Sequence, residues 1–355
     1  MFTSGTTGRA KGATHSHRNF IGACWFHLLN DAVATELGQP LQPGRRYLLV
    51  SPLFHISSLH NLAVIRLVTG DAAVIYQGKF EPDRVLSLIE RQRVTNWGGM
   101  PTLLTRIVEY PELDRFDLSS LRTVSISSAP SSPALKNRVR DKLPLAARSL
   151  GTTYGLTESS TAVTVASAGE LLVDPATVGR AVPTMQVRIC DESGVPVPDG
   201  AEGEICLLGP LVMVGYWRDP EATARATTPD GWFRTGDLGT MRDGALSMSS
   251  RRSDLILRGA ENVYPAEVES QLADHPGVRD CVVLGVPHAD LGEEVAAVVV
   301  TRSNIDVDEA ELREFLSARL GRYKIPTRWM ITTRELPRNA TGKVKRREIN
   351  WPDDA

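Results

Sequence analysis

Helical and strand-like apolar patterns alternate along the first 130 residues, and this alternation restricts the folds open to the chain. The helical and strand-like stretches follow one another in the order 19–33, 47–54, 84–94 and 123–130. Strands that are separated by helices pair in parallel, with the helices as crossover connections. Ligands of such sheets bind beyond the carboxyl ends of the strands. The sequence therefore predicts an α/β fold with a site where 52–55, 127–130 and the loop around Tyr154 emerge.

The pattern changes twice further along the chain. From about Leu171, short strands alternate with Asp, Gly and Pro turns, which is typical of an antiparallel barrel or sandwich. The polar, small-residue stretch 247–254 suits a linker or hinge. We therefore expect a large domain over 1–250, with a parallel sheet, crossover helices and a small β-barrel subdomain. A small α+β C-terminal domain is expected over 251–355.

The C-terminal region has clear boundary signals of its own. Pro265 stands where the first turn of a helix would begin, and 281–286 and 295–301 are β-branched runs typical of strands. Asp308 and Glu311 have capping-box spacing before an amphipathic stretch. These signals together predict an independent α+β unit.

Composition excludes several kinds of partner. Lys and Arg number 40 against 42 Asp and Glu, so no basic field favours nucleic acid or an anionic membrane. No apolar run approaches the length of a membrane span. The four cysteines stand far apart, without metal-binding spacing, at Cys24, Cys190, Cys206 and Cys281. We therefore expect a cytoplasmic protein with reduced thiols.

The opening segment TSGTTGRAKG is rich in glycine and hydroxyl side chains. Its glycines permit close backbone approach to an anion, its hydroxyls add donors, and Lys11 adds a positive charge. The spacing differs from that of a Walker A loop. Taken alone, the segment is equally consistent with a flexible polar tail.

Four later stretches have both functional and ordinary interpretations. YGLTE (154–158) combines an aromatic ring, a hydroxyl and a carboxylate, which suit a purine, a phosphate and Mg²⁺, although an ordinary turn would look the same. GWFRTGDLG (231–239) places Asp237 in a glycine-flanked turn, where it could accept from both hydroxyls of a ribose, although a surface hairpin would look the same. The arginines of 249–269 and Lys343 in 337–348 could belong to solvated segments.

These stretches, taken together and in this order, resemble the AMP-forming adenylate synthetases. TSGTTGRAKG resembles the phosphate loop of that family, and the later motifs are PLFH, YGLTE, GYWRDPEATARATTPDGWFRTGDLG, the arginine-rich hinge and PRNATGK. The resemblance runs from residue 2 to residue 348. Within the family it is strongest to acyl-CoA synthetases of the fatty-acid type, because RGAENVYPAEVE and GRYKIP resemble their C-terminal motifs. It implies an ATP-dependent carboxylic acid–CoA ligase that works through an acyl-adenylate, with ATP, Mg²⁺ and CoA as cofactor and co-substrates.

The resemblance also implies a role for individual residues. The phosphate loop comprises Thr3, Ser4, Gly5, Thr6, Thr7, Gly8 and Lys11. The other nucleotide-binding positions are Ser128, Ala129, Pro130, Tyr154, Thr157, Asp237 and Arg251. Glu158 would hold Mg²⁺, His55 would line the mouth of the acyl pocket, and Lys343 would bridge the α-phosphate and the carboxylate. The remaining positions are Gly259 and Ala260 at the CoA tunnel and Ser253 at the hinge of a mobile C-terminal domain.

The sequence departs from the family pattern in ways that leave alternatives open. Ala260 stands where a second glycine is usual, so an acyl-AMP ligase that serves a carrier protein is one alternative. Members of the family also carry a long stretch before the phosphate loop, with strands of the same sheet and part of the acyl pocket. We therefore expect Met1 to be internal and the large domain to be truncated at its N-terminus. A partner chain that supplies the missing part, or a non-catalytic AMP-binding remnant, is the other alternative.

Overall fold

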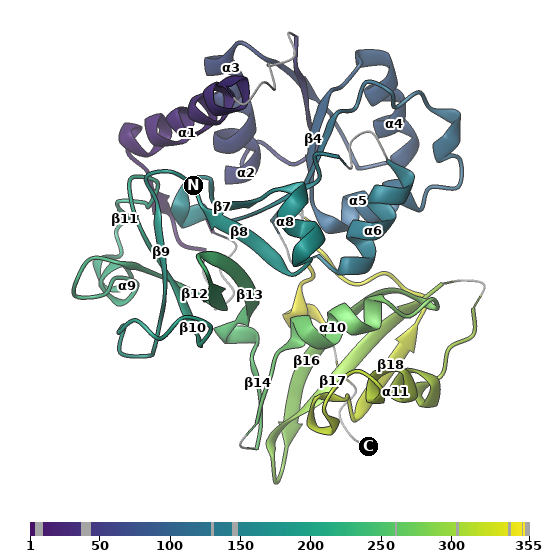
Figure 1. The fold of residues 1–355 in the computed structure, drawn as a ribbon. Helices are drawn as coiled ribbons and strands as arrows, with labels where there is room; N and C mark the ends of the chain where they lie inside the picture. The colour runs from purple at the N-terminus through teal and green to yellow at the C-terminus, as the bar shows by residue number, and fades with distance from the viewer. Residues whose placement is uncertain are drawn as a thin grey trace. The chain divides into compact units, whose positions relative to one another are not determined.

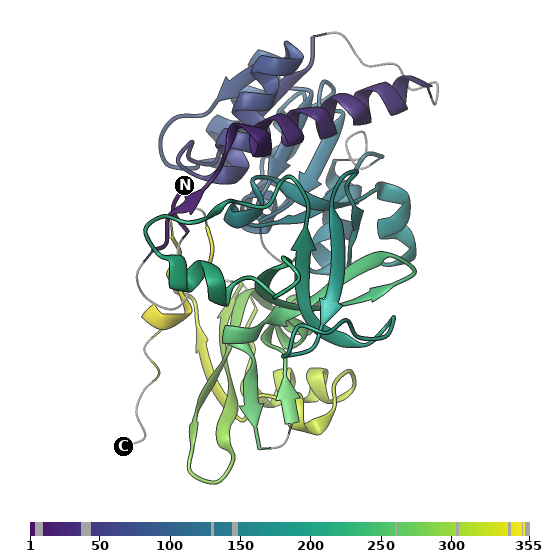
Figure 2. The same ribbon diagram turned by 90° about the vertical axis from the view of Figure 1, so that its left-hand side faces the viewer.

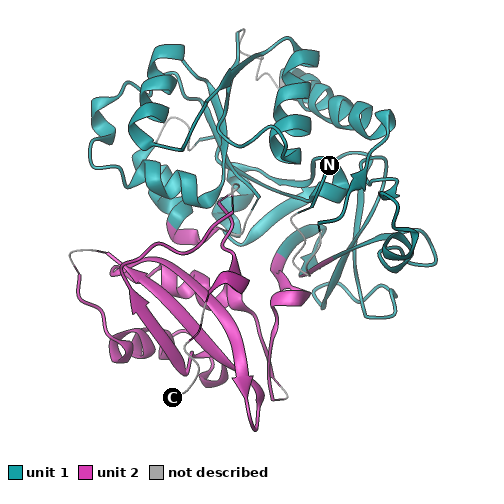
Figure 3. Cartoon of the chain, turned by 180° about the vertical axis from the view of Figure 1, so that it is seen from behind, with its two compact units in different colours: residues 1–129, 135–235, 239–247 teal, residues 130–134, 236–238, 248–355 magenta. Residues whose placement is uncertain are grey.

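The computed structural model describes residues 1–3, 10–36, 44–128, 131–143, 148–259, 261–302, 305–339, 342–349 and 351. The chain divides into two compact units (Figure 3). Unit 1 consists of residues 1–129, 135–235 and 239–247, and unit 2 consists of residues 130–134, 236–238 and 248–355.

The first part of unit 1 is a parallel sheet with strands in the order β3–β2–β4–β5–β6 (Figure 1). These strands are β2 (Arg46–Leu49), β3 (Ala72–Ile75), β4 (Asn96–Gly99), β5 (Thr123–Ile126) and β6 (Gly151–Gly155). Tyr47 pairs with Asn96, and Asn96 pairs with Thr123, so these three residues form one row across the sheet. The predicted α/β alternation is confirmed.

Helices cover both faces of the parallel strands (Figures 1 and 2). One face carries α1 (His17–Glu36), α2 (Ile56–Ser58), the π-helix η1 (Leu59–Val64) and α3 (Ile65–Thr69). The other face carries α4 (Pro82–Gln92), α5 (Pro101–Val108) and α6 (Pro133–Lys142). Trp97, Val124 and Ile126 pack with the apolar faces of α4, α5 and α6 into the main core. Because side chains alternate along a strand, Gly98, Thr123 and Ser125 belong to the opposite face.

Antiparallel strands continue the same sheet, in the order β6–β7–β8–β13–β12–β10–β9. They are β7 (Ala162–Ala166), β8 (Thr177–Ala181), β9 (Gln186–Cys190), β10 (Glu202–Leu208), β12 (Phe233–Arg242) and β13 (Ala245–Arg251). Two short helices, α8 (Ala168–Val173) and α9 (Pro220–Arg225), lie between them along the chain. The change to antiparallel strands, predicted from about Leu171, therefore begins slightly earlier, at β7.

Unit 2 is built on a mixed sheet packed against two helices. Its strands are β14 (Ile256–Arg258), β15 (Glu261–Val263), β16 (Val278–His288), β17 (Gly292–Thr301) and β18 (Arg328–Thr332), in the order β15–β14–β17–β16 with β18 parallel to β17. Apolar residues of α10 (Pro265–Ala273) and α11 (Glu309–Ser317) complete the core. The Asp308 carboxylate accepts from the Glu311 N–H at 2.8 Å, as the N-cap prediction requires.

Two predicted segments differ in the structure. The run 47–54 is a strand only as far as Leu49; Pro52 follows, which has no N–H to donate to a ladder. The stretch 247–254 is not an extended linker, because it is the end of β13 followed by the single 3₁₀ turn η4 (Arg252–Asp254). No helix in the described part of the chain has the length and apolarity that crossing a bilayer requires.

Candidate active site

The base of the predicted phosphate loop is a short antiparallel ladder. The Thr3 N–H donates to the Lys11 carbonyl at 2.8 Å, and the Lys11 N–H donates to the Thr3 hydroxyl oxygen at 3.3 Å. Phe2 and Gly12 form the next bridge of the ladder. The tip of the loop, with Ser4, Gly5, Thr6, Thr7 and Gly8, lies outside the described residues. The ladder therefore fixes the two ends of the loop side by side.

The YGLTE stretch turns sharply at the end of β6. Tyr154 is a buried residue of that strand. Gly155 comes next, and a Cβ at this position would lie 2.3 Å from the Thr161 carbonyl oxygen, so only glycine fits here. The chain then forms the 3₁₀ turn η3 (Thr157–Ser159). This local geometry places the Glu158 carboxylate just beyond the carboxyl end of a central strand, where α/β sheets bind ligands.

Tyr216 contacts both Lys11 of the loop and the carboxylate of Glu158. The sequence motifs assigned no role to this residue. Its hydroxyl donates to Glu158 Oε1 at 2.9 Å, and its ring centre lies 4.8 Å from Lys11 Nζ. The pairing of β1 (Ala13–Thr14) with β11 (Gly215–Tyr216) brings these distant segments together. Burial and then the Glu158 carboxylate raise the pKa of Tyr216, so the hydroxyl stays protonated and donates.

The donor set around Glu158 suits a hard cation that is held mainly by a substrate. Within the described residues, no group of three or more His, Cys, Asp or Glu side chains is arranged to hold a metal ion. Mg²⁺, however, commonly takes only one or two protein carboxylates and completes its shell with phosphate oxygens and water. A single carboxylate beside a lysine therefore fits Mg²⁺ bound to a nucleoside triphosphate.

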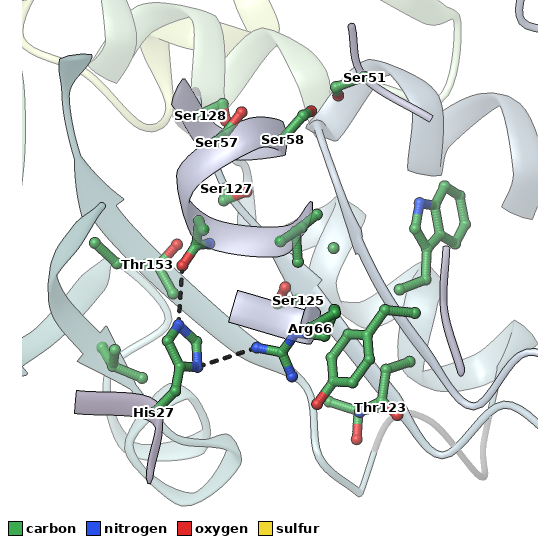
Figure 4. Close-up of a pocket in the computed structure, with 18 of the residues that line it drawn as sticks. His27, Ser51, Ser57, Ser58, Arg66, Thr123, Ser125, Ser127, Ser128 and Thr153 are labelled. Atoms are coloured by element: carbon green, nitrogen blue, oxygen red, sulfur yellow. Dashed lines mark hydrogen bonds between the residues drawn. The ribbon is translucent and has the colours of Figure 1, made fainter. Parts of the chain in front are cut away.

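A cavity of about 210 Å³ lies in unit 1, on the polar face of the parallel strands (Figure 4). Ser57 and Ser58 line it from α2, Ser125 from β5 and Thr153 from β6. Figure 4 shows Ser127 and Ser128 toward one end of the cavity, with His27, Arg66 and Thr123 toward the other. Because Ser127 and Ser128 follow β5, the first end is the carboxyl end of the sheet.

A hydrogen-bonded network closes the other end of the cavity. His27 Nδ1 accepts from the Arg66 guanidinium at 3.3 Å, and His27 Nε2 is 3.2 Å from Asn61 Oδ1. The Thr161 hydroxyl donates to the same Asn61 oxygen at 2.6 Å, and Arg66 forms an ion pair with Asp71 at 3.1 Å. Burial, and then the Arg66 charge, lower the pKa of His27 to about 4. The ring is therefore neutral near pH 7 and donates through Nε2–H.

Two predicted positions lie at or near the cavity. Ser128 lines it and has a φ of 71°, an unusual value for a residue other than glycine, and such strained residues are often found at functional sites. Ala129 and Pro130 lie outside the described residues. His55 is absent from the lining, but its Nδ1 is 3.2 Å from the hydroxyl of Ser57, which does line the cavity.

Two further histidines of unit 1 lie beside these elements, His15 half-buried and His60 buried. His15 Nδ1 lies 2.8 Å from the Ser160 hydroxyl oxygen, and the His15 and His60 rings meet edge to face with centroids 5.3 Å apart. Burial is the main cause that lowers the pKa of each ring to about 4. Both rings are neutral near pH 7.

Unit 2 holds the predicted ribose-binding pair. Asp237 is 4% exposed, and its carboxylate lies 3.2 Å from Arg251 Nε. Ser253 stands in η4, two residues after Arg251, and its hydroxyl contacts the neighbouring Asp254 carboxylate at 3.2 Å. A carboxylate accepts hydrogen bonds from hydroxyl donors, which is the chemistry that a ribose diol requires.

The predicted catalytic lysine lies on a tight hairpin of unit 2. The Lys343 N–H donates to Asn339 Oδ1 at 3.0 Å, and the Asn339 N–H donates to the Lys343 carbonyl at 2.9 Å. Gly259, with a φ of 65°, turns the chain between β14 and β15, and its N–H donates to the Leu291 carbonyl at 2.7 Å. Ala260 lies outside the described residues.

Two sequence profiles cover most of the chain. Residues 1–217 match the AMP-binding enzymes, and residues 267–343 match the C-terminal domain of AMP-binding enzymes. A feruloyl-CoA synthase from Amycolatopsis is 38% identical over 98% of this chain and 68% of its own length. An indoleacetate–CoA ligase from Aromatoleum aromaticum is 35% identical over 98% of this chain and 66% of its own length.

Solved structures show the same fold at comparable identity. ATP-bound MatB from Rhodopseudomonas palustris aligns with a TM-score of 0.86 and 34% identity, over 98% of this chain and 66% of its own. The o-succinylbenzoate CoA synthetase of Bacillus subtilis, in complex with an acyl-adenylate intermediate, aligns with a TM-score of 0.84 and 31% identity, over 99% and 69%. The chain thus spans about two thirds of the length of these relatives.

Proposed function

The chain belongs to the AMP-binding enzymes, within the group of AMP-forming acyl-CoA synthetases, and from this premise we propose that it is an ATP-dependent carboxylic acid–CoA ligase. In the first half-reaction, a substrate carboxylate attacks the α-phosphorus of ATP and pyrophosphate leaves. In the second half-reaction, the CoA thiol attacks the acyl carbon, AMP leaves and a thioester forms. Chemistry of this kind asks a protein mainly to position its substrates and to neutralise charge.

The observation that carries the proposal is the contact series Lys11–Tyr216–Glu158. It brings a cation at the end of a glycine-rich loop close to a carboxylate at the end of a central strand. A triphosphate needs a lysine for its β- and γ-phosphates and an acidic residue for the metal that accompanies them. Mg²⁺ bound through Glu158 would neutralise phosphate charge. The loop residues from Thr3 to Gly8 would add N–H and hydroxyl donors to the same phosphates.

The other unit 1 positions then take complementary roles. Thr157 would donate to the α-phosphate, and Tyr154 and Ser128 would flank the adenine. The cavity of unit 1 would hold the acyl group, with its carboxyl-end opening near the α-phosphate and His55 at its mouth. The cavity runs inward from Ser127 and Ser128, so a bound acid would place its carboxylate at the carboxyl ends of the strands.

The remaining positions would hold the ribose, neutralise charge and permit movement between the two half-reactions. Asp237 and Arg251 would hold the ribose, and Lys343 would neutralise the charge that builds as carboxylate and phosphate join. We place the domain boundary at 250/251, with a hinge at Ser253 that lets the C-terminal domain move between the half-reactions. Gly259 and Ala260 would border the path of CoA.

Exchange of radiolabelled pyrophosphate into ATP tests the function directly. Acid-dependent exchange, followed by CoA-dependent thioester formation, is the expected result. Nucleotide binding by calorimetry without exchange for any acid would favour a non-catalytic AMP-binding remnant. Exchange without use of free CoA, combined with transfer to a carrier protein, would favour the carrier-dependent ligase.

A further inference from the structure

The depth of the cavity can be read from the register of the sheet. Tyr47, Asn96 and Thr123 form one row at the amino ends of their strands, and all three line the cavity. Ser127 lies four residues beyond Thr123, which corresponds to about 13 Å of extended chain. The Arg66 guanidinium stacks 3.8 Å from the centre of the Tyr47 ring. Arg66 therefore lies at the amino-end row, remote from the end that we assign to the carboxylate.

The wall of the cavity combines a polar strand face with apolar side chains such as those of Phe26, Val50 and Met100. Asn96, Thr123, Ser125 and Thr153 all belong to the cavity face of the strands, and α2 adds further hydroxyls. A polar face of this kind would leave an alkyl chain in contact with groups that need hydrogen bonds. The volume of about 210 Å³ exceeds that of an engineered apolar cavity of ~150 Å³ that accepts benzene. One substituted ring therefore fits in size.

Three buried polar atoms of the lining residues lack a partner in the described part of the chain, one of them Nε1 of the core residue Trp97. Arg66 is 3% exposed, and its Nε–H has no hydrogen-bond partner there, whereas both terminal nitrogens of its guanidinium are bonded. Ser58 is 1% exposed, and its hydroxyl is likewise without a partner. An unpaired buried donor is costly. A ligand atom that accepts from either group would therefore gain binding energy.

The charges around Arg66 decide which kind of acceptor fits. Asp71 forms ion pairs with Arg66 at 3.1 Å and with Arg45 at 2.9 Å, and Arg45 also pairs with Asp31 at 2.7 Å. Two arginines thus face two aspartates, and the neighbouring His27 is neutral near pH 7. A second carboxylate on the ligand would be buried here without a counter-charge, which is strongly unfavourable. A neutral oxygen needs no counter-charge.

We propose that this cavity selects carboxylic acids of about one ring in bulk that carry a neutral, hydrogen-bond-accepting oxygen at the end remote from the carboxylate. Arg66 Nε–H is the specificity-determining donor at that remote end. The inference rests on the proposed ligase function, because it describes the acyl group that the ligase activates.

Pyrophosphate exchange with four matched acids tests this selectivity. The acids are para-methoxyphenylpropanoate, its para-ethyl isostere, its para-carboxy analogue and decanoate. The methoxy acid should have a kcat/KM about tenfold above that of the ethyl acid, since one hydrogen bond distinguishes the two. The carboxy acid and decanoate should be poorer still. Equal values for the methoxy and ethyl acids, or a preference for decanoate, would overturn the proposal.

Variants assign the selectivity to its residues. Arg66→Lys should reduce the ratio of methoxy to ethyl kcat/KM by threefold or more, because it removes the unpaired donor at the remote end. Arg45→Lys is the matched control: it alters the same ion network but does not line the cavity, so the ratio should stay as in the wild type. An equal loss in Arg45→Lys would mean that the network acts only through stability.

A binding measurement separates this proposal from the ligase function. If no acid supports exchange, the ligase function fails, and calorimetric titration of the methoxy and ethyl acids still decides the selectivity. Tighter binding of the methoxy acid, lost in Arg66→Lys, would then support the cavity assignment alone. Equal affinities would reject it.

Discussion

Tyr216 is the residue that connects the proposed phosphate and metal ligands. Tyr216→Phe removes the hydroxyl that donates to Glu158 Oε1 at 2.9 Å but keeps the ring beside Lys11. The Glu158 carboxylate loses a bond that orients it, so the KM for MgATP should rise about five- to tenfold, with kcat changed less, in line with the loss of one hydrogen bond to a charged group. Pyrophosphate exchange as a function of MgATP concentration measures both constants.

A second tyrosine supplies the control for this variant. The Tyr110 hydroxyl also donates to a carboxylate, that of Asp83 at 3.4 Å, on the face of the sheet that carries α4 and α5. Tyr110→Phe should leave the KM for MgATP unchanged. The role given to Tyr216 is wrong if both variants behave alike.

Short sequence motifs point to single residues, but they do not predict which other residues these contact. The roles of Lys11 and Glu158 were predicted from the family resemblance, because each motif taken alone was also consistent with a polar tail or an ordinary turn. Tyr216 lies within the GYWRDPE stretch of the family resemblance, yet its contacts depend on the pairing of β1 with β11, which no local pattern reveals. The unpaired donors of Arg66 and Ser58 were likewise not predictable, because a missing hydrogen bond is a property of the packed structure.

Gly179 tests how tightly the antiparallel strands pack. It lies in β8 with a φ of 87°, and a Cβ there would come within 1.9 Å of the Val165 carbonyl oxygen of β7. Gly179→Ala combines left-handed backbone strain with a backbone clash that no rotamer can relieve, so we expect a loss of about 3 kcal/mol or more, or failure to fold. Urea denaturation of the purified chain measures the loss.

Gly231 separates the two contributions to that loss. Its φ of 89° is nearly the same, but no atom lies within 4 Å of the Cβ that alanine would add. Gly231→Ala should therefore cost only the strain, about 1–2 kcal/mol. Similar losses in both variants would show that the strands yield to the added methyl group.

At the scale of elements, the sequence predicted the type of each element more reliably than its ends. The helix expected over 84–94 is α4 (Pro82–Gln92), and Pro265 begins α10 as predicted. The strand run 47–54 was predicted too long, because its apolar residues continue past Leu49 into a loop that the missing N–H of Pro52 helps to define. Apolar character alone does not distinguish a strand from the loop that follows it.

For the whole molecule, one buried and two half-buried histidines make stability depend on pH. His15, His27 and His60 have folded-state pKa values of about 4, below the ordinary value of about 6.5. Between these values the unfolded chain binds protons that the folded chain excludes. The stabilisation is therefore fully present above about pH 6.5 and is lost as pH falls toward 4. Thermal melts across this window should show Tm falling steadily.

Single variants should change the steepness of that fall. His60→Gln removes one of the excluded protons, so its Tm should be lower at neutral pH but should fall less steeply on acidification. His17 is exposed, and His17→Gln should behave as the wild type. Parallel curves of Tm against pH for the wild type and His60→Gln would contradict the lowered pKa assigned to His60.

The whole molecule also divides its proposed chemistry between two units. The phosphate loop and Glu158 belong to unit 1, whereas Lys343 belongs to unit 2, on a hairpin tied by Asn339. Lys343→Ala should lower acid-dependent pyrophosphate exchange by about a hundredfold or more, as is typical when a group that stabilises transition-state charge is removed. Thioester formation from a supplied acyl-adenylate should change by less than about threefold, because that step no longer joins a carboxylate to a phosphate.

The neighbouring Lys345 makes this comparison specific. It is a charged residue on the same segment, and its ammonium group pairs with Glu348 at 2.7 Å. Lys345→Ala removes an equal charge and should leave both half-reactions intact. If Lys343→Ala instead lowers the two half-reactions equally, with its Tm unchanged, the lysine serves binding common to both steps rather than adenylation. Adenylation would then depend on charges supplied within unit 1 alone.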